Sequence, residues 1–439
     1  MKAFFKPIGV ALLAIALLAG CNNKPKTIDN NNANKPENTE ATANNSNSAA
    51  TNTANSEGGP TEFSGSIENN VTWPDLGLDV DYIVDGWINI NGNALLTIEP
   101  GVTIMFTGAN GGIGVGENAG LRMVGTAEKP IILEGPTNNS NNGSWQKVRI
   151  ESKRNDNQFE YVQFLRGGSD EGEWQGVVHL ANGRLGMKNC LIDGSLGMGL
   201  VIEYDEGFLT AFENNTIKNC SVYPWLSEYF LPLTKNIGSG NIFENNGKNM
   251  VCCKNSGTDF QENTTIRELP IPYYFPIGVS FDGNKTVTIE PGVKFMMPIN
   301  TGIGVGDECG FVANGTEEKP IVFFCEEEGE AWNGIRFDSK RNNNVINYCQ
   351  FKNCGANDSW GERSCLYIRS EAKLTLTNNV FGPSFYNGVG IENIENWGKV
   401  THSGNTFVNC KEGNVWIEGG GEYNGTEYEG GKALENLPQ

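Results

Sequence analysis

TIEPGV at residues 97–102 recurs at residues 288–293, and this repeated stretch decides the fold. Four further segments recur in the same order: GIGVG at 112–116 and 302–306, EKPI at 128–131 and 318–321, SKRN at 152–155 and 339–342, and NTIKNC at 215–220 with NTFVNC at 405–410. The spacing between matched segments stays between 186 and 191 residues. A nearly constant spacing predicts that one whole module is duplicated, with small insertions and deletions confined to loops.

Apolar residues within each copy alternate with polar ones. The pattern runs through Leu96, Ile98, Val102, Ile104 and Phe106 in the first copy, and through Val287, Ile289, Val293, Phe295 and Met297 in the second. A period of two is typical of strands, because successive side chains of a strand point to opposite faces. No segment of eleven or more residues carries a sustained helical stripe, and the 56 glycines are nearly twice the average usage. We therefore expect short strands and almost no helix.

A short asparagine motif returns between the expected strands. It reads KNC at 188–190, 218–220 and 352–354, ENN at 213–215 and 244–246, TNN at 377–379, and VNC at 408–410. Asparagine tolerates the left-handed backbone conformation that a tight corner needs, and stacked asparagine side chains can form hydrogen-bonded ladders. The recurrence predicts successive turns of one solenoid.

On these motifs the chain resembles the right-handed parallel β-helix repeat proteins of the pectin-lyase-like superfamily, in a bacterial lipoprotein form with duplicated TIEPGV modules. The resemblance covers roughly residues 72–418. It implies an all-β fold, a right-handed parallel β-helix built from two tandem copies of one module. It implies little about activity, because the superfamily includes lyases, hydrolases, epimerases, adhesins and inert scaffolds.

The expected domain order follows from the repeat and from composition. It is a lipoprotein signal peptide at 1–20, a disordered Asn-rich tether at 21–62, module 1 with an N-terminal cap at 63–225, joining coils at 226–270, module 2 at 271–418, and a C-terminal cap and tail at 419–439. The ends of a solenoid need covering, because unpaired strand edges invite aggregation. We expect the segments from 63 to about 90 and beyond about 418 to be these caps. One continuous rod and two hinged rods both fit the sequence.

The N-terminus predicts export and lipidation. Lys2 and Lys6 precede a short apolar run at 8–18, which is typical of a signal peptide. Leu18-Ala19-Gly20-Cys21 resembles the lipobox of bacterial lipoproteins, which implies a lipid on Cys21. We expect a lipid anchor in the cell envelope, in the outer membrane of a Gram-negative host, because Asn22 is not the Asp associated with inner-membrane retention in enteric bacteria. Which face of the membrane carries the protein stays open.

The charge of the chain limits its partners. The formal net charge is −20, and removing residues 1–20 takes away two lysines and no acid, which leaves −22. So acidic a protein is a poor partner for nucleic acid or for anionic headgroups, which need clustered Lys and Arg. Acidic surfaces suit cations, neutral sugars or basic proteins.

No cofactor or metal site is predicted from a specific motif. Besides Cys21 there are ten Cys and two His, without a CxxC pair, so zinc has no support; disulfides and free buried thiols stay open. Ca²⁺ is the one ion left open. Glu326-Glu327-Glu328 with Glu330, and Asp79, Asp81 and Asp85, lack the ordered ligand spacing of a calcium loop, so solvated faces are the favoured interpretation.

Catalytic chemistry is weakly indicated. The resemblance implies an Arg or Lys base beside Ca²⁺-binding carboxylates for a lyase, or clustered Asp for a hydrolase. The basic pairs Lys153-Arg154 and Lys340-Arg341 occupy the same place in both copies, which favours a structural corner. Asp170, Glu171 and Glu173 precede Trp174, whereas Ala356, Asn357 and Ser359 stand at the matched places before Trp360. This divergence fits an active site in the first copy only, and solvated loop charge is favoured over it.

Two pairs of matched tryptophans have different contexts. Trp145 and Trp332 precede strands and are expected to pack at a coil corner. Trp174 and Trp360 lie in Gly- and acid-rich loops, where an exposed ring beside hydrogen-bonding groups can stack on a sugar. We take Trp174, Trp360, Asp170, Glu171 and Glu173 as the candidate ligand-binding residues, with no catalytic residue assigned.

The sequence leaves three functions open. The favoured hypothesis is a lipid-anchored envelope protein that displays the β-helix as a non-catalytic binding or adhesion surface, for carbohydrate or a protein partner. The alternative is a polysaccharide lyase or glycoside hydrolase, so enzyme activity stays open. The third is a structural envelope scaffold.

Overall fold

A computed structural model describes residues 51–53, 58–136, 138, 141–169, 175–255, 257–356, 363–369 and 371–439, which lie in one compact unit. Its secondary structure is almost entirely strand. The helices in this part of the chain are two 3-10 segments, η1 at Leu231–Thr234 and η2 at Ile394–Lys399. The expected scarcity of helix is confirmed. In the described ranges, no helix has the length and apolar character needed to cross a membrane.

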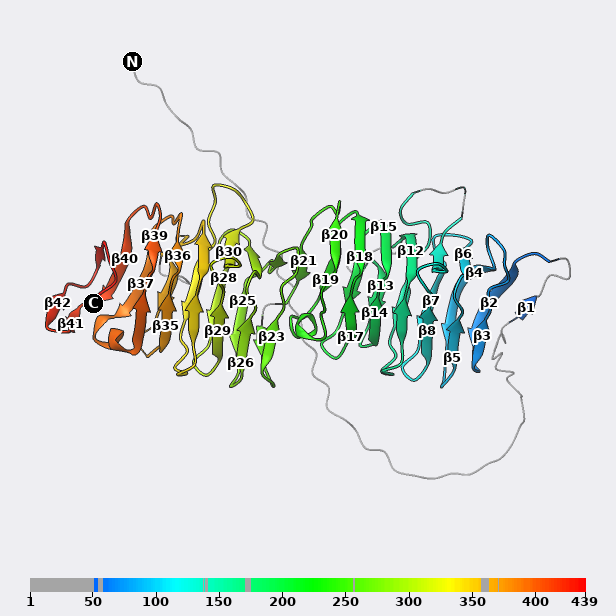
Figure 1. The fold of residues 1–439 in the computed structure, drawn as a ribbon, viewed down its shortest axis with the longest axis horizontal. Helices are drawn as coiled ribbons and strands as arrows, with labels where there is room; N and C mark the ends of the chain where they lie inside the picture. The colour runs from blue at the N-terminus through cyan, green and yellow to red at the C-terminus, as the bar shows by residue number, and fades with distance from the viewer. Residues whose placement is uncertain are drawn as a thin grey trace, which may run out of the picture. The chain divides into compact units, whose positions relative to one another are not determined.

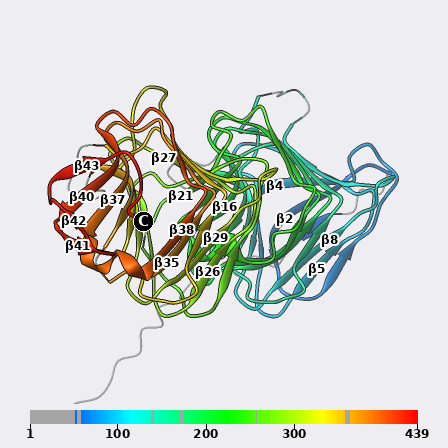
Figure 2. The same cartoon turned by 60° about the vertical axis from the view of Figure 1, so that its left-hand side comes forward.

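The strands form a parallel β-solenoid of about 13 turns, as the sequence predicts (Figure 1). Each regular coil has three short strands on three faces, which are named here the first, second and third face. For example, β8 (Gly120–Val124), β9 (Ile131–Glu134) and β10 (Val148–Ile150) make one coil. They pair in parallel with β11 (Gln158–Glu160), β12 (Val162–Gly167) and β13 (Gly176–Leu180) of the next coil. Figure 2 shows the coils from a more end-on direction.

The first half of the stack carries six strands on each face. The first face holds β3 (Val71–Trp73), β5 (Leu95–Ile98), β8, β11, β14 (Arg184–Lys188) and β17 (Phe208–Glu213). The second holds β6 (Thr103–Phe106), β9, β12, β15 (Leu191–Ser195), β18 (Thr216–Cys220) and β20 (Ile242–Glu244), and the third holds β7 (Gly112–Val115), β10, β13, β16 (Met198–Ile202), β19 (Trp225–Ser227) and β21 (Val251–Cys253). The long strands β2 (Thr61–Ile67) and β4 (Tyr82–Ile90) precede them, and β4 pairs with both β6 and β7.

The second half repeats this order. Its first face holds β23 (Thr264–Ile266), β26 (Thr286–Ile289), β29 (Gly310–Asn314), β32 (Val345–Asn347), β35 (Leu374–Thr377) and β38 (Val400–Ser403). Its second face holds β24 (Tyr273–Tyr274), β27 (Lys294–Met297), β30 (Ile321–Cys325), β33 (Cys349–Lys352), β36 (Val380–Phe381) and β39 (Thr406–Phe407). Its third face holds β22 (Gly257–Asp259), β25 (Val279–Asp282), β28 (Gly302–Val305), β31 (Gly334–Phe337), β34 (Ser364–Ile368), β37 (Asn387–Asn393) and β40 (Gly413–Gly419).

The strand ladder runs from one half into the other without a break, but it changes face. β21 of the third face pairs with β24, which opens the second face of the second half. Among the described strands, β20 pairs with β18 alone. Pro270 and Pro272 lie in the segment before β24, and proline has no N–H to donate to a ladder. The joining segment therefore belongs to the stack. Across it, the strand ladder passes from the third face of the first half to the second face of the second half.

The core is a column of stacked apolar side chains. In the second half, Phe295, Phe323, Phe351 and Phe381 lie above one another on successive coils, with ring centroids 5.1, 5.1 and 4.8 Å apart. These separations are those of favourable aromatic pairs. Each ring completes the burial of its neighbours, so every coil depends on the next for its core.

Asparagines occupy the corners as the sequence predicts. Asn189, Asn214, Asn219, Asn245, Asn353, Asn378 and Asn409 have left-handed backbone conformations. A second set points inward and joins the coils. The Oδ1 of buried Asn379 accepts the N–H of Cys349 at 2.9 Å, while its Nδ2 donates to the Ile346 carbonyl oxygen at 2.9 Å. Asn215 does the same for Cys190 and Met187, at 3.0 Å each.

Matched positions of the two halves make matched contacts. Gly101 and Gly292 have φ of 95° and 88°, a region that favours glycine. The fully buried Trp145 donates from Nε1 to the Leu165 carbonyl oxygen at 2.8 Å, and Trp332 donates to that of Lys352 at 3.1 Å. The predicted packing role of this tryptophan pair is confirmed.

The ends are covered by antiparallel strands. At the C-terminal end β43 (Lys432–Leu434) pairs with β40, and the hairpin of β41 (Gly421–Tyr423) and β42 (Thr426–Tyr428) contacts η2. At the other end β1 (Thr51–Thr53) pairs with β2. The N-terminal edge thus differs from expectation: β2 and β4 pair in parallel within the stack, and β1 lies in the predicted tether. Backbone pairing needs no apolar side chain, so composition did not reveal β1.

The inward asparagines yield a stability prediction. Asn379→Ala should lower the free energy of unfolding by about 2 to 4 kcal/mol, because it leaves the Cys349 N–H and the Ile346 carbonyl buried without this partner. Denaturant unfolding followed by circular dichroism measures the loss. The control is Asn314→Ala, whose exposed amide bonds to the Asn347 side chain and whose replacement should cost less than about 0.5 kcal/mol. Equal losses in the two variants would contradict this role.

Candidate functional site

The residues predicted from the sequence as ligand-binding lie outside the described residues. These are Asp170, Glu171, Glu173, Trp174 and Trp360, and the predicted lipidation site, Cys21, lies outside as well. The surrounding strands are nevertheless defined. Residues 170–174 fall between β12 and β13, and residues 357–362 fall between β33 and β34. Both segments therefore connect the second face to the third at matched places in the two halves.

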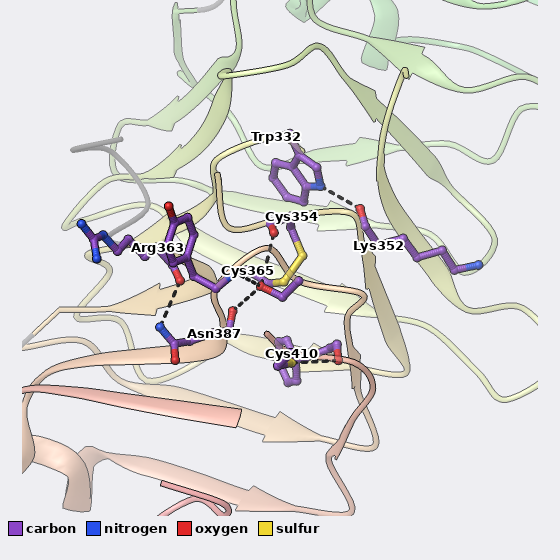
Figure 3. The surroundings of a disulfide bond; sticks show 10 residues. Trp332, Lys352, Cys354, Arg363, Cys365, Asn387 and Cys410 are labelled. Atoms are coloured by element: carbon purple, nitrogen blue, oxygen red, sulfur yellow. Dashed lines mark hydrogen bonds between the residues drawn. A yellow bond between two sulfur atoms is a disulfide. The ribbon is translucent and has the colours of Figure 1, made fainter. Parts of the chain in front are cut away.

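A disulfide spans the second of these segments. Cys354 and Cys365 are bonded, with Cα atoms 4.9 Å apart, which joins the corner after β33 to β34 (Figure 3). The Arg363 guanidinium lies over the Tyr386 ring, 5.1 Å from its centroid. The other described cysteines are free thiols, buried at every position except the partly exposed Cys410. One disulfide and several buried thiols thus resolve the alternatives that the sequence left open.

The outer surface of the third face carries a hollow in the first half. Along β7, Ile113 and Val115 point into the core, so the glycines of GIGVG face outward. Without side chains there, a depression remains between Asn89 and Asn91 on one side and Arg149 and Glu151 on the other. We call this depression, lined also by Trp87, Gly114 and Gly116, the Trp87 hollow.

Trp87 lies flat on the glycine floor. A Cβ atom added to Gly112 would be 2.2 Å from its Cζ3, so only glycine allows the indole to lie this close to the sheet. The ring is partly exposed, and its Nε1 donates to Asn89 Oδ1 at 3.0 Å. An accessible ring, two carboxamides and the Arg149–Glu151 ion pair therefore line one hollow. These groups can stack on a sugar ring and bond to its hydroxyls.

The second half has the same floor without the aromatic ring. β28 repeats the alternating glycines, between Ser280 and Asp282 on β25 and Arg336 on β31. The strand register places Gly278 where the first half has Trp87. The complete hollow therefore belongs to the first half.

A buried polar network lies beside the hollow. His179 on β13 is the ladder neighbour of Arg149 and is 2% exposed. Its Nε2 lies 3.0 Å from Glu203 Oε2, and its Nδ1 lies 3.5 Å from Lys147 Nζ. A neutral ring with the proton on Nε2 satisfies both partners. Burial, together with the Lys147 and Arg149 charges, lowers the pKa of His179 to about 3.

Two glutamates meet at the far end of this network. Glu203 and Glu228 follow β16 and β19, whose last residues are paired, so they stand on adjacent coils. Burial and the Glu203 charge raise the pKa of Glu228. In the second half, Arg369 lies between Asp338 and Glu392, at 3.5 and 2.7 Å. The register places Ala181 at that position in the first half, so Glu203, the counterpart of Glu392, lacks this cation.

The remaining sequence candidates are structural. The repeated basic corner is confirmed, since Lys153 pairs with Glu206 at 3.0 Å and Lys340 with Asp307 at 2.9 Å. The interpretation of Asp81 as a solvated acid is wrong. Asp81 is fully buried and accepts backbone N–H groups from Leu76 and Thr103, because it holds the turn before β4. Within the described residues, no group of three or more His, Cys, Asp or Glu is arranged to hold a metal ion.

Trp87, Arg149 and His179 are not among the candidate residues that the sequence predicts. One signal could have found the hollow: the strict alternation in GIGVG, which puts three glycines on one face of a strand. The partners of that strand could not be read, because they depend on the lengths of the corners between strands.

The buried histidine predicts a pH dependence. The pKa of His179 is about 3 in the folded protein and about 6.5 in the unfolded chain. Below pH 6.5 the unfolded chain binds a proton that the folded protein does not, so the free energy of unfolding falls as the pH falls. The free energy of unfolding of the wild type, relative to that of His179→Gln, should be lower at pH 5 than at pH 7 by about 2 kcal/mol. Denaturant unfolding at both pH values measures it; a difference independent of pH would rule out a neutral buried ring.

A comparison with family models agrees with this architecture. Residues 65–179 match the model described as a pectate-lyase like beta helix domain, a span that runs from β2 to β13 and includes Trp87 and His179. Comparisons with the curated proteins and with the solved structures gave no match. Together with the parallel solenoid, the family match bears out the resemblance seen in the sequence. The chain is a parallel β-helix protein, and residues 65–179 of its first half are similar to the pectate-lyase like beta helix model.

Proposed function

We propose that this protein is a lipid-anchored envelope protein that binds carbohydrate, without cleaving it, on the outer third face of its β-helix. The Trp87 hollow carries the proposal. It combines an accessible indole, two carboxamides and an ion pair on a floor of glycines, in the span that matches the family model. Hollows with one aromatic surface and a few oriented polar groups are typical of small-ligand sites.

The exposure of the Trp87 ring favours a ligand over a purely structural role for the indole. A ring that lies across glycines also covers exposed backbone, as Tyr367 does over Gly390 in the second half. Tyr367 is 2% exposed, however, whereas Trp87 is partly exposed and lines an open hollow. The exposed part of Trp87 is the surface that a sugar ring would cover.

Trp174, with Asp170, Glu171 and Glu173 before it in the sequence, stays in the proposal as a contributor near the hollow, whereas Trp360, which falls between β33 and β34, would serve a separate contact in the second half. The 170–174 segment is preceded by β12 and followed directly by Gln175 and β13, the strand of His179. A ligand in the Trp87 hollow would thus lie on the same face as the strand that this segment enters.

Export and lipidation are supported by chemistry. The Cys354–Cys365 disulfide fits an oxidising compartment outside the cytoplasm. A lipid on Cys21, followed by the predicted tether, would hold the β-helix at the membrane of the envelope, and we propose the outer membrane.

Catalysis is the second candidate, and one observation favours it. The Lys147–His179–Glu203 network, with Glu228 beside it, brings acids and bases together on the same face as the hollow. Against it, Lys147 and His179 are 6% and 2% exposed, so a substrate would have little access to either. Assays for new reducing ends and for unsaturated uronate products, run on every glycan that binds, decide between binding and cleavage.

Trp87→Ala tests the binding site. The change should weaken binding to the retained glycan by about ten-fold, because the stacking surface is lost. Affinity electrophoresis on a glycan panel followed by calorimetry measures it, and thermal unfolding checks the fold. The matched control is Trp416→Ala, a partly exposed outward tryptophan on β40 of the second half, which should leave affinity unchanged. A sharply lowered melting temperature with unaltered affinity would show that Trp87 only packs.

Cys21→Ala tests the anchor. The variant should appear in the soluble fraction without labelled fatty acid, because the thiol that takes the lipid is gone, while the wild type stays with the membranes. Cys410→Ala, which removes a partly exposed thiol of the β-helix, should leave membrane attachment unchanged. A Cys21→Ala protein that remains membrane-bound and labelled would disprove the assignment.

A further inference from the structure

Tyr204 is a second aromatic residue with an accessible ring, at the edge of the third face of the first half. It lies in the bend after β16, one residue beyond Glu203, and 41% of it is exposed. The ladder β4–β7–β10–β13–β16 places it four strands from Trp87 along the stack. With about 4.8 Å between neighbouring strands and about 3.3 Å per residue along each, the backbone positions of the two residues are roughly 25 Å apart on a diagonal.

The surface between the two rings is shallow and polar. Its outward positions include Gly114 on β7, Gly116 directly after β7 and the buried Ala181 after β13, none of which projects beyond a methyl group. Arg149, Glu151 and Glu203 line the same diagonal with hydrogen-bonding groups. The pKa of Tyr204 is raised by its hydrogen bond to Glu203, so the phenol is tied to the end of this row.

The charges on this path disfavour an anionic ligand. Arg149 is paired with Glu151, and Lys147 is buried against His179. Glu203 and Glu228 lie near the Tyr204 end, and Glu203 lacks the arginine that pairs with its counterpart Glu392 in the second half. The whole chain carries a net charge of −20, which repels a polyanion at long range. An uncharged polysaccharide is repelled neither by these glutamates nor by the net charge of the protein.

We propose that the Trp87 hollow is one end of an extended site for an uncharged polysaccharide, which crosses the third face diagonally to stack on Tyr204. This inference rests on the proposed function. It adds the substrate class, the direction of the chain and a second stacking residue. It also sets the ligand apart from the polyanionic pectate in the description of the matching family model.

Matched pairs of polymers test the charge. Lipid-free wild-type protein is run through gels that contain hydroxyethylcellulose or carboxymethylcellulose, methyl-esterified or de-esterified polygalacturonate, and dextran or dextran sulfate. The uncharged member of at least one pair should retard the protein, with at least ten-fold tighter binding than its anionic partner. The difference in affinity between the uncharged and the anionic polymer should become smaller in high salt, because salt screens the repulsion. Equal or tighter binding of the anionic members would overturn the substrate class.

A length series tests the path. Affinity should rise from the disaccharide to the octasaccharide of the retained polymer. Trp87→Ala should weaken binding at every length, whereas Tyr204→Ala should weaken only the longer chains, by about five-fold or more. Tyr204→Phe keeps the ring but loses the bond to Glu203, and it should bind long chains as the wild type does.

The outcomes separate the two proposals. If Tyr204→Ala binds the longest chain as tightly as the wild type while Trp87→Ala does not, the extended path is wrong and the hollow stands. If no polymer is retained, or if Trp87→Ala changes nothing, the proposed function fails and this inference fails with it. Because Tyr204 is exposed, thermal unfolding of its variants should match the wild type.

Discussion

The structure depends on hydrogen bonds from the backbone of one coil to the next. Strand pairing supplies most of them, but the corners break the ladder, and there inward asparagines replace it. Leu121 N–H donates to Asn157 Oδ1 at 3.0 Å, and Phe311 N–H donates to Asn344 Oδ1 at 2.8 Å. A buried N–H without a partner is costly, so these side chains fix both the corner and the coil above it. The stacking of identical core residues follows, because each coil is then held in register.

Because the register is fixed, the residues of the outer surface also stack in columns. Every residue that alternates with a core residue faces outward, directly above the same position of the previous coil. In the first half one such column runs through Asn89, Gly114, Arg149 and His179, which are far apart in the sequence. The core thus determines which polar groups become neighbours, and the glycine coil between Asn89 and Arg149 becomes the floor of a hollow.

The difference between inward and outward positions explains which features the sequence predicts. Inward positions must be apolar and corners must turn, so alternation and asparagine were enough to identify the solenoid. Outward positions obey no such rule, and their neighbours depend on corner lengths that no pattern reveals. Trp87 therefore looked like any other strand residue, and Asp81 looked solvated because its backbone donors come from the turn before β4 and from the next coil. The change of face at Pro270 and Pro272 was equally hidden.

The two halves show how such a fold can carry different surfaces on one frame. A core change in one coil disturbs the coils on both sides, whereas an outward change disturbs only lateral neighbours. The two halves accordingly share an arginine at one matched position, Arg149 in the first and Arg336 in the second. At another matched position the first half has Ala181 and the second has Arg369. In the second half, Arg369 pairs with both Asp338 and Glu392, so the charged groups of that surface neutralise one another. The first half instead has an open hollow, and an accessible ring beside polar groups on a rigid face is what a ligand can contact.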